Sequence, residues 1–156
     1  MSGIEIGAQV PNFKLASTGG KTVSLSEFQG KTVVLYFYPK DDTPGCTLEG
    51  QDFRDHAADF QKLNAVVLGV SRDNVSSHEK FKDKYELNFD LLADEDETLC
   101  NMFDVIKEKN MYGKQVRGIE RSTFLVDNQG VLRQAWRKVK VDGHVTAVID
   151  AVKQLS

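Results

Sequence analysis

Cysteine is scarce in this sequence, whose 156 residues include only Cys46 and Cys100. Two cysteines are too few for a disulfide framework and too few for a structural zinc site built from thiolates. The three histidines, His56, His78 and His144, show no metal-ligand spacing near either cysteine. We therefore expect no metal and no other cofactor, and we expect both cysteines to be free, buried or redox-active.

Long apolar stretches and blocks of like charge are also missing. The longest apolar run is about seven residues, whereas a helix that spans a bilayer needs roughly 20. The opening segment MSGIEIGAQVPNF lacks the basic and apolar regions of a secretory signal. The net charge is −3, and no cluster of Lys and Arg stands apart from its neighbouring acids. These absences predict a cytoplasmic protein that binds neither membranes nor nucleic acid.

No feature of the sequence divides the chain into parts. The chain has only three prolines, is 40% hydrophobic and 28% charged, and shows no linker, repeat or low-complexity segment. Its length suits one core and leaves little room for a second. We expect residues 1–156 to form a single domain.

Two apolar segments rich in β-branched residues, 32–38 and 65–71, predict strands that are covered on both faces. Between them, the segment 46–63 places apolar residues at helical spacing. Strand, helix and strand within about 40 residues predict a βαβ unit with parallel strands.

The rest of the sequence predicts further helices and antiparallel strands. Turn residues at Gly19 and Gly20 indicate an N-terminal β-hairpin, and 127-DNQG-130 indicates a second hairpin between the strands 123–126 and 131–136. Together these elements predict an α/β fold of the thioredoxin-like class, in which helices flank a central mixed sheet. A short strand is predicted at 89–92, and helices at 76–85, which starts with capping-box spacing between Ser76 and Glu79, at 95–103 and at 143–155.

The most informative segment is 36-YFYPKDDTPGCTLEGQDF-53, where a buried strand is followed by a polar loop and a helix. Thr43 suits the N-cap. Pro44 suits the first helical position, because proline has no backbone N–H and an N–H there would have no acceptor within the helix. Cys46 is then placed in the first helical turn, where unpaired N–H groups and the helix dipole favour an anion. A structural cysteine would more often lie within an apolar run, so this position favours a reactive thiolate.

This segment resembles the peroxiredoxin signature Pro39-x-x-x-Thr43-x-x-Cys46, and Glu49 stands where that family has an acid. The wider context is similar to the bacterioferritin-comigratory or Q-type peroxiredoxins. Their pattern also includes an arginine, which Arg121 matches in 121-RSTFLVD-127. The resemblance covers almost the whole chain.

The resemblance implies a thiol peroxidase that reduces hydrogen peroxide and organic hydroperoxides through a sulfenic acid at Cys46. By the same resemblance, Thr43, Arg121 and the Cys46 amide hold the two peroxide oxygens in line. Pro39 would screen the thiolate from water, and Glu49 would fix the arginine. The implied reductant is thioredoxin or a glutathione- or glutaredoxin-type thiol, and the implied state is a monomer.

The sequence departs from many relatives at the resolving cysteine, the second cysteine that reacts with the sulfenic acid. Gln51 occupies one familiar resolving position, and the predicted helix 76–85 contains no cysteine. Cys100 lies elsewhere, and we interpret it as a filler at the edge of the core. The sequence therefore leaves open whether Cys100 is the resolver or whether the cycle uses Cys46 alone.

Other activities fit the residues less well. A disulfide oxidoreductase would need a second cysteine where Glu49 follows Cys46. A cysteine hydrolase would need a histidine base, and His56 lies ten residues further along the same predicted helix, roughly 15 Å away. A binding protein that keeps the cysteine as a relic would not need the set Pro39, Thr43, Cys46 and Arg121.

Overall fold

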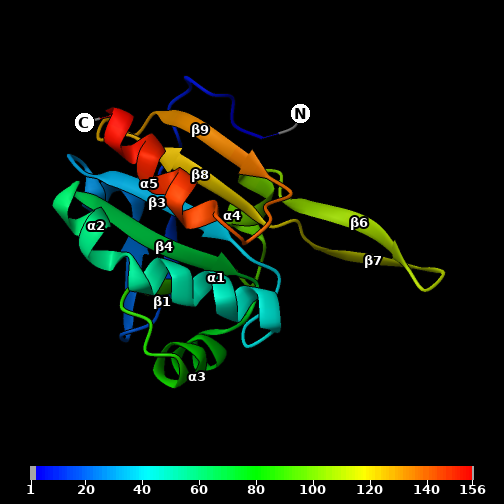
Figure 1. Cartoon of the computed structure of the whole chain (residues 1–156). Helices are drawn as coiled ribbons and strands as arrows, with labels where there is room; N and C mark the ends of the chain where they lie inside the picture. Colours follow the sequence, from blue (N-terminus) through cyan, green and yellow to red (C-terminus); the bar gives the residue numbers. More distant parts are fainter. Residues whose placement is uncertain (1–2, 156) are drawn as a thin grey trace.

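A computed structural model describes residues 3–155 and has a seven-stranded sheet at its centre (Figure 1). The strand order is β2-β1-β5-β4-β3-β8-β9, and β6 and β7 form a separate two-stranded sheet. The strands are β1 (Lys14–Ser17), β2 (Lys21–Ser24), β3 (Thr32–Phe37), β4 (Ala65–Ser71), β5 (Asp90–Ala93), β6 (Ile106–Met111), β7 (Lys114–Ile119), β8 (Ser122–Val126) and β9 (Leu132–Arg137).

The central sheet mixes strand directions, as the sequence predicts. Strands β3, β4 and β5 run parallel to one another, whereas β8 pairs antiparallel with both β3 and β9. The N-terminal hairpin of β1 and β2 is present, and β1 joins it to the sheet by pairing with β5. The helical segments are the 3₁₀ helix η1 (Leu25–Phe28), α1 (Pro44–Asp55), α2 (Ala57–Lys62), α3 (Val75–Lys84), α4 (Thr98–Met102) and α5 (His144–Leu155).

Both faces of the sheet are covered, which explains the continuous apolar run in β3. Side chains alternate between the two faces of a strand. On one face Leu35 belongs to an apolar cluster that includes Leu99 of α4. On the other face Tyr36 belongs to a second cluster, which includes Phe53 of α1 and Val148 of α5. Of the helices described between residues 3 and 155, none is long and apolar enough to cross a membrane.

The predicted helix 46–63 is wrong as a single element, because the chain forms two helices there. His56 ends α1 with φ −105° and ψ 15°, and α2 begins at the next residue. The His56 side chain places Nδ1 2.8 Å from the carbonyl oxygen of Asp52. Such local side-chain contacts to the backbone compete with continuation of a helix.

The predicted capping box is also wrong. Helix α3 starts one residue earlier, and the side chain of Asn74 accepts a hydrogen bond from the Ser77 amide at 2.8 Å. The Glu79 carboxylate instead accepts a hydrogen bond from the Gly19 amide at 2.7 Å. Helix α4 is shorter than the predicted helix 95–103 and begins only at Thr98.

The β6–β7 hairpin was not predicted. Its strands carry mostly polar side chains, and the hairpin projects from the body of the molecule (Figure 1). Tyr112 and Gly113 form the turn with φ values of 53° and 79°. A ribbon that buries little of either face has no regular alternation of apolar and polar residues, which is the signal that identifies most strands.

Candidate active site

Strand pairing brings together two segments that lie far apart in the sequence. Strand β3 leads into a loop and then into α1, and Phe37 at its end pairs with Ser122 at the start of β8. Arg121 immediately precedes β8, so it lies beside the loop that leads to Cys46. The backbone of Arg121 is held in turn, because its carbonyl oxygen accepts a hydrogen bond from the Val139 amide at 3.0 Å.

Cys46 is buried in the first turn of α1, with 2% of its surface exposed. Nη2 of Arg121 lies 3.5 Å from its sulfur. Burial lowers the pKa of Arg121, but Glu49 and Cys46 outweigh this effect and raise it above its ordinary value. The thiol therefore faces a permanent cation at the positive end of a helix, and both features stabilise a thiolate.

Glu49 holds the other arm of the same guanidinium. Its Oε1 accepts a hydrogen bond from Nη1 of Arg121 at 2.7 Å, and its side chain is fully buried. Burial raises the pKa of Glu49 to about 7, although the nearby Arg121 opposes this shift. Its Oε2 has no hydrogen-bond partner within residues 3–155. One face of α1 thus carries the thiol and the acid, and Arg121 contacts both.

Thr43 occupies the N-cap of α1, but its hydroxyl makes no capping hydrogen bond. The hydroxyl instead donates to the carbonyl oxygen of Lys40 at 2.8 Å, within the loop that precedes the helix. Its oxygen lone pairs remain available to accept a hydrogen bond from a bound molecule. Pro39, which the sequence assigned to screening the thiolate, lies on the same loop as an exposed residue.

Gly45 was not selected from the sequence, but its missing side chain matters for the position of Arg121. A Cβ atom at this position would lie 3.0 Å from Nη2 of Arg121. The absence of a side chain therefore lets the guanidinium approach the first turn of α1. A glycine between the N-terminal proline and Cys46 is the sequence signal for such a close approach.

Cys100 lies on α4, in the apolar cluster on the opposite face of the sheet from Cys46. It is fully buried, and its amide donates a hydrogen bond to the buried Asp94 carboxylate at 2.7 Å. Burial raises the pKa of the Cys100 thiol far above its ordinary value, and Asp94 raises it further. Both features keep this thiol protonated and unreactive.

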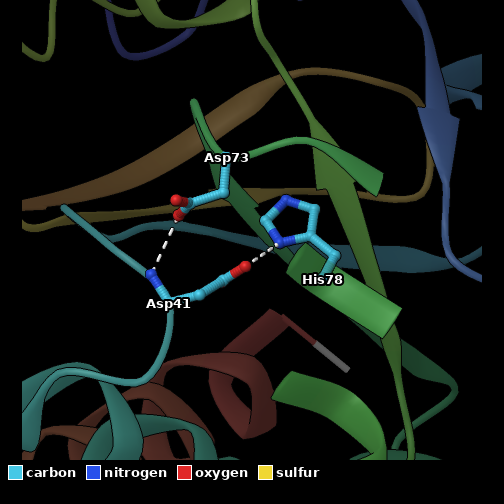
Figure 2. A group of neighbouring side chains, drawn as sticks. All are labelled: Asp41, Asp73 and His78. Atoms are coloured by element: carbon cyan, nitrogen blue, oxygen red, sulfur yellow. Dashed lines mark hydrogen bonds and ion pairs between the residues drawn. The ribbon is translucent and has the colours of Figure 1, made fainter. Parts of the chain in front are cut away.

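Two buried histidines lie outside the group formed by Cys46, Glu49 and Arg121. His144 accepts or donates a hydrogen bond at 2.8 Å with the Thr123 hydroxyl, and burial, together with Arg121, lowers its pKa to about 4. His78 lies with Asp41 and Asp73 in a compact polar group next to the β3–α1 loop (Figure 2). In the sequence, His78 shows no metal-ligand spacing, and no motif points to Asp41.

Comparison with known proteins agrees with this architecture. Residues 6–135 match the AhpC/TSA family. The chain is 51% identical to peroxiredoxin Bcp of Bacillus subtilis over 98% of both chains, and 54% identical to that of Xanthomonas campestris over 96% of this chain and 94% of the relative. A solved structure of Xanthomonas campestris peroxiredoxin Q superposes with a TM-score of 0.88 at 56% identity, covering 91% of this chain and 90% of that one. A Xylella fastidiosa PrxQ variant gives a TM-score of 0.93 at 45% identity, covering 99% and 98%.

The fold is thioredoxin-like, and a buried cysteine lies against an arginine at the start of a helix. Together with the peroxiredoxin relatives, these features define a thiol-dependent peroxidase. The chain belongs to the AhpC/TSA family and, within it, to the Bcp or Q-type peroxiredoxins. Such an enzyme reduces a peroxide at the expense of a thiol.

Proposed function

We propose that Cys46 is the peroxidatic cysteine and that it reduces hydrogen peroxide and organic hydroperoxides. The observation that carries this proposal is the contact of 3.5 Å between its sulfur and Nη2 of Arg121, at the N-terminus of α1. The same position combines a buried sulfur, a fixed cation and free backbone N–H groups, which are the features that a thiolate nucleophile needs.

In the proposed reaction the Cys46 thiolate attacks the terminal oxygen of the hydroperoxide. A sulfur–oxygen bond forms as the oxygen–oxygen bond breaks, and the sulfur is oxidised by two electrons to a sulfenic acid. The other oxygen leaves with the negative charge and takes up a proton as water or an alcohol. Arg121 and the Cys46 amide stabilise this developing charge, and Thr43 orients the peroxide through its hydroxyl. Pro39 limits the access of water to the thiolate.

Glu49 acts on the reaction through Arg121. Arginine presents its donors in a planar fork, so one arm can bind Glu49 while the other faces the sulfur. The contact at 2.7 Å to Glu49 fixes the plane of the guanidinium before substrate arrives. An arginine that is already oriented does not have to reorganise during the reaction.

The proposed substrates include alkyl hydroperoxides as well as hydrogen peroxide. One solved relative, the Xanthomonas campestris bacterioferritin comigratory protein, is described by its alkyl peroxide reduction activity and is 55% identical to this chain. Cys46 here lies in an apolar cluster that includes Tyr38 and Val145. Apolar surroundings of this kind tolerate an alkyl group on the peroxide.

We also propose a cycle that uses Cys46 alone. A thiol of thioredoxin or of a glutathione- or glutaredoxin-type reductant attacks the sulfenic sulfur, water leaves, and a mixed disulfide forms. A second thiol then releases Cys46. The buried and protonated Cys100 supports this route, because it offers no thiolate to the sulfenic acid. We further propose that the chain works as a single-domain monomer in the cytoplasm.

Replacement of the proposed nucleophile tests this function. Cys46→Ser should abolish peroxide reduction with dithiothreitol and leave the fold intact, because the change is nearly isosteric. Peroxide consumption and circular dichroism measure the two quantities, and Cys100→Ser is the matched control. A folded Cys46→Ser protein that keeps more than a few per cent of the parent rate would show that Cys46 is not the nucleophile.

A further inference from the structure

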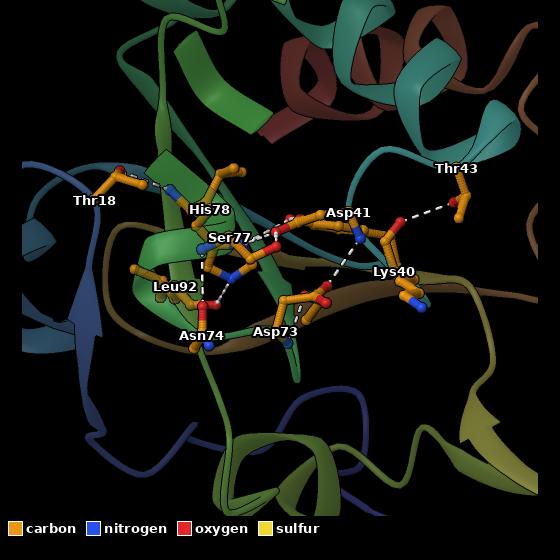
Figure 3. Close-up of polar contacts among 12 residues, drawn as sticks. Thr18, Lys40, Asp41, Thr43, Asp73, Asn74, Ser77, His78 and Leu92 are labelled. Carbon is orange, nitrogen blue, oxygen red and sulfur yellow. Dashed lines mark hydrogen bonds and ion pairs between the residues drawn. The ribbon is translucent and has the colours of Figure 1, made fainter. Parts of the chain in front are cut away.

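Asp41 lies in the β3–α1 loop, five residues before Cys46, and is almost completely buried. Its carboxylate collects three donors from around it. Oδ1 accepts a hydrogen bond from the Tyr38 hydroxyl at 2.6 Å, and Oδ2 accepts one from the Ser77 hydroxyl at 2.8 Å. Oδ2 also lies 2.7 Å from Nδ1 of His78 (Figures 2 and 3). A loop that leads to the proposed nucleophile is thus attached to α3.

His78 is fully buried, and both of its ring nitrogens face acceptors. Nε2 lies 2.9 Å from the carbonyl oxygen of Leu92 on β5, and a carbonyl can only accept a hydrogen bond. Nδ1 faces a carboxylate that already receives two hydroxyl donors, so this nitrogen donates as well. An imidazole ring that donates from both nitrogens is an imidazolium cation. His78 and Asp41 therefore form a buried ion pair.

This ion pair lies in a continuous set of contacts between the central sheet and the proposed nucleophile. Nε2 of His78 is anchored on β5, and Nδ1 holds the carboxylate of Asp41. The Asp41 amide donates to the Asp73 carboxylate at 2.8 Å, which fixes the backbone of the loop. In the same loop, the hydroxyl of Thr43 donates a hydrogen bond to the carbonyl oxygen of Lys40 (Figure 3).

The same three side chains could be mistaken for a metal site, because their ligand atoms lie within 4.8 Å of one another. Each is already occupied by protein groups. Asp73 accepts hydrogen bonds from the Ser71 hydroxyl and from the Asp41 amide on Oδ2, and His78 uses both nitrogens as donors. A ring nitrogen that carries a hydrogen cannot ligate a metal.

We propose that His78 is a positioning residue for the peroxide reaction: its ion pair with Asp41 braces the β3–α1 loop against the sheet and so fixes Thr43 and Cys46 relative to the peroxide. The inference rests on the proposed function, in which these two residues are the reacting and orienting groups. Displacement of a reacting group by about 1 Å can slow a reaction on the order of 100-fold. A loose loop would therefore cost rate even though His78 touches no reacting atom.

Two substitutions separate the two contacts of His78. In His78→Asn the amide nitrogen lies at the position of Nδ1 and can still donate to Asp41, but nothing reaches Leu92. In His78→Gln the amide nitrogen lies at the position of Nε2, so the Leu92 contact remains and the Asp41 contact is lost. Both variants remove the buried cation, so both should lower the midpoint of thermal unfolding by similar amounts.

Single-turnover oxidation by hydrogen peroxide, followed by fluorescence of Trp136, the only tryptophan, measures the reaction of Cys46. We expect His78→Gln to lower the second-order rate constant at least ~10-fold. We expect His78→Asn to stay within about threefold of the parent, because it keeps the contact that holds the loop. Equal rates in the two variants, or a parent rate in His78→Gln, would overturn the inference.

A measurement on the unaltered protein covers the case in which neither variant folds. Nitrogen-15 chemical shifts of the His78 ring should show a hydrogen on both nitrogens, because both face acceptors, and a ring with one bare nitrogen would overturn the inference. Cys46→Ser serves as the blank in the oxidation assay. If Cys46→Ser gave the parent signal, the proposed function itself would be wrong and the inference with it. If it gave none, a failure of the His78 prediction would contradict the positioning role alone.

Discussion

Arg121 shows why the residue type matters at this site as much as the charge does. One guanidinium nitrogen binds the buried Glu49 and another faces the sulfur of Cys46. A lysine carries a single point charge and could not make both contacts in fixed geometry. The structure thus brings together three of the residues that the sequence selected, while Thr43 lies on the loop and Pro39 is exposed.

At the scale of single residues, His144 should make stability depend on pH. Burial, together with Arg121, lowers its pKa to about 4 in the folded protein, against an ordinary value of 6.5. The unfolded chain therefore binds a proton that the folded protein rejects. The contribution of neutral His144 to stability is fully present above pH 6.5. As the pH falls from 6.5 towards 4, the free energy of unfolding decreases by up to about 3 kcal/mol.

His144→Gln removes this titration while keeping an amide that can reach the Thr123 hydroxyl. Glu49 titrates in the opposite sense, because a pKa raised to about 7 makes the folded protein less stable as the pH rises from 4.5. The parent curve alone is therefore ambiguous, and the difference between variant and parent is the informative quantity. In urea unfolding, the free energy of unfolding of the variant should rise relative to that of the parent as the pH falls from 6.5 to 4. A difference that does not change with pH would contradict the assignment.

At the scale of elements, the start of α1 depends on a residue without a side chain. Gly45→Ala should slow oxidation of Cys46 at least ~10-fold, because its Cβ would lie 3.0 Å from Nη2 of Arg121 and displace the guanidinium. The substitution should not destabilise the protein, because the end of a long side chain can move and alanine favours a helix by up to about 1 kcal/mol.

Gly50→Ala is the matched control within the same helix. A Cβ there would lie 3.4 Å from Cδ2 of Leu87 and does not approach Arg121. Stopped-flow oxidation and thermal unfolding of both variants separate the effects on rate and on stability. Equal rates for Gly45→Ala and Gly50→Ala would show that the approach of Arg121 to the helix is not needed.

The elements that were predicted correctly are those with strong local signals. The apolar segments 32–38 and 65–71 could be identified because buried parallel strands have no polar alternation. The end of α1 at His56 and the cap at Asn74 were missed, because several residues nearby offer similar local hydrogen bonds. The β6–β7 hairpin was missed because it buries little of either face.

At the scale of the whole molecule, contacts between distant segments set the limit of prediction. Arg121 could be selected from the sequence because it belongs to a motif. The ion pair between Asp41 and His78 could not, because it depends on how α3 lies against the loop after β3. The sequence pattern of either segment contains no information about its contact with the other segment. Such pairs can therefore be identified only in the packed structure.

The placement of the two cysteines leads to a prediction about the oxidised protein. They lie in apolar clusters on opposite faces of the central sheet. A disulfide requires Cα atoms within about 7 Å, so Cys100 could reach the sulfenic acid only after local unfolding of its surroundings. Its protonated thiol would also be a poor nucleophile.

One equivalent of hydrogen peroxide should therefore leave a sulfenic acid at Cys46 that dimedone traps, while Cys100 still titrates as a free thiol after denaturation. Cys100→Ser should turn over with dithiothreitol near the parent rate, because α4 stays packed throughout the cycle. Mass spectrometry of the labelled peptides distinguishes this outcome from a disulfide. A Cys46–Cys100 peptide in the oxidised protein would instead make Cys100 the resolver, and α4 would then have to leave its face of the sheet in every cycle.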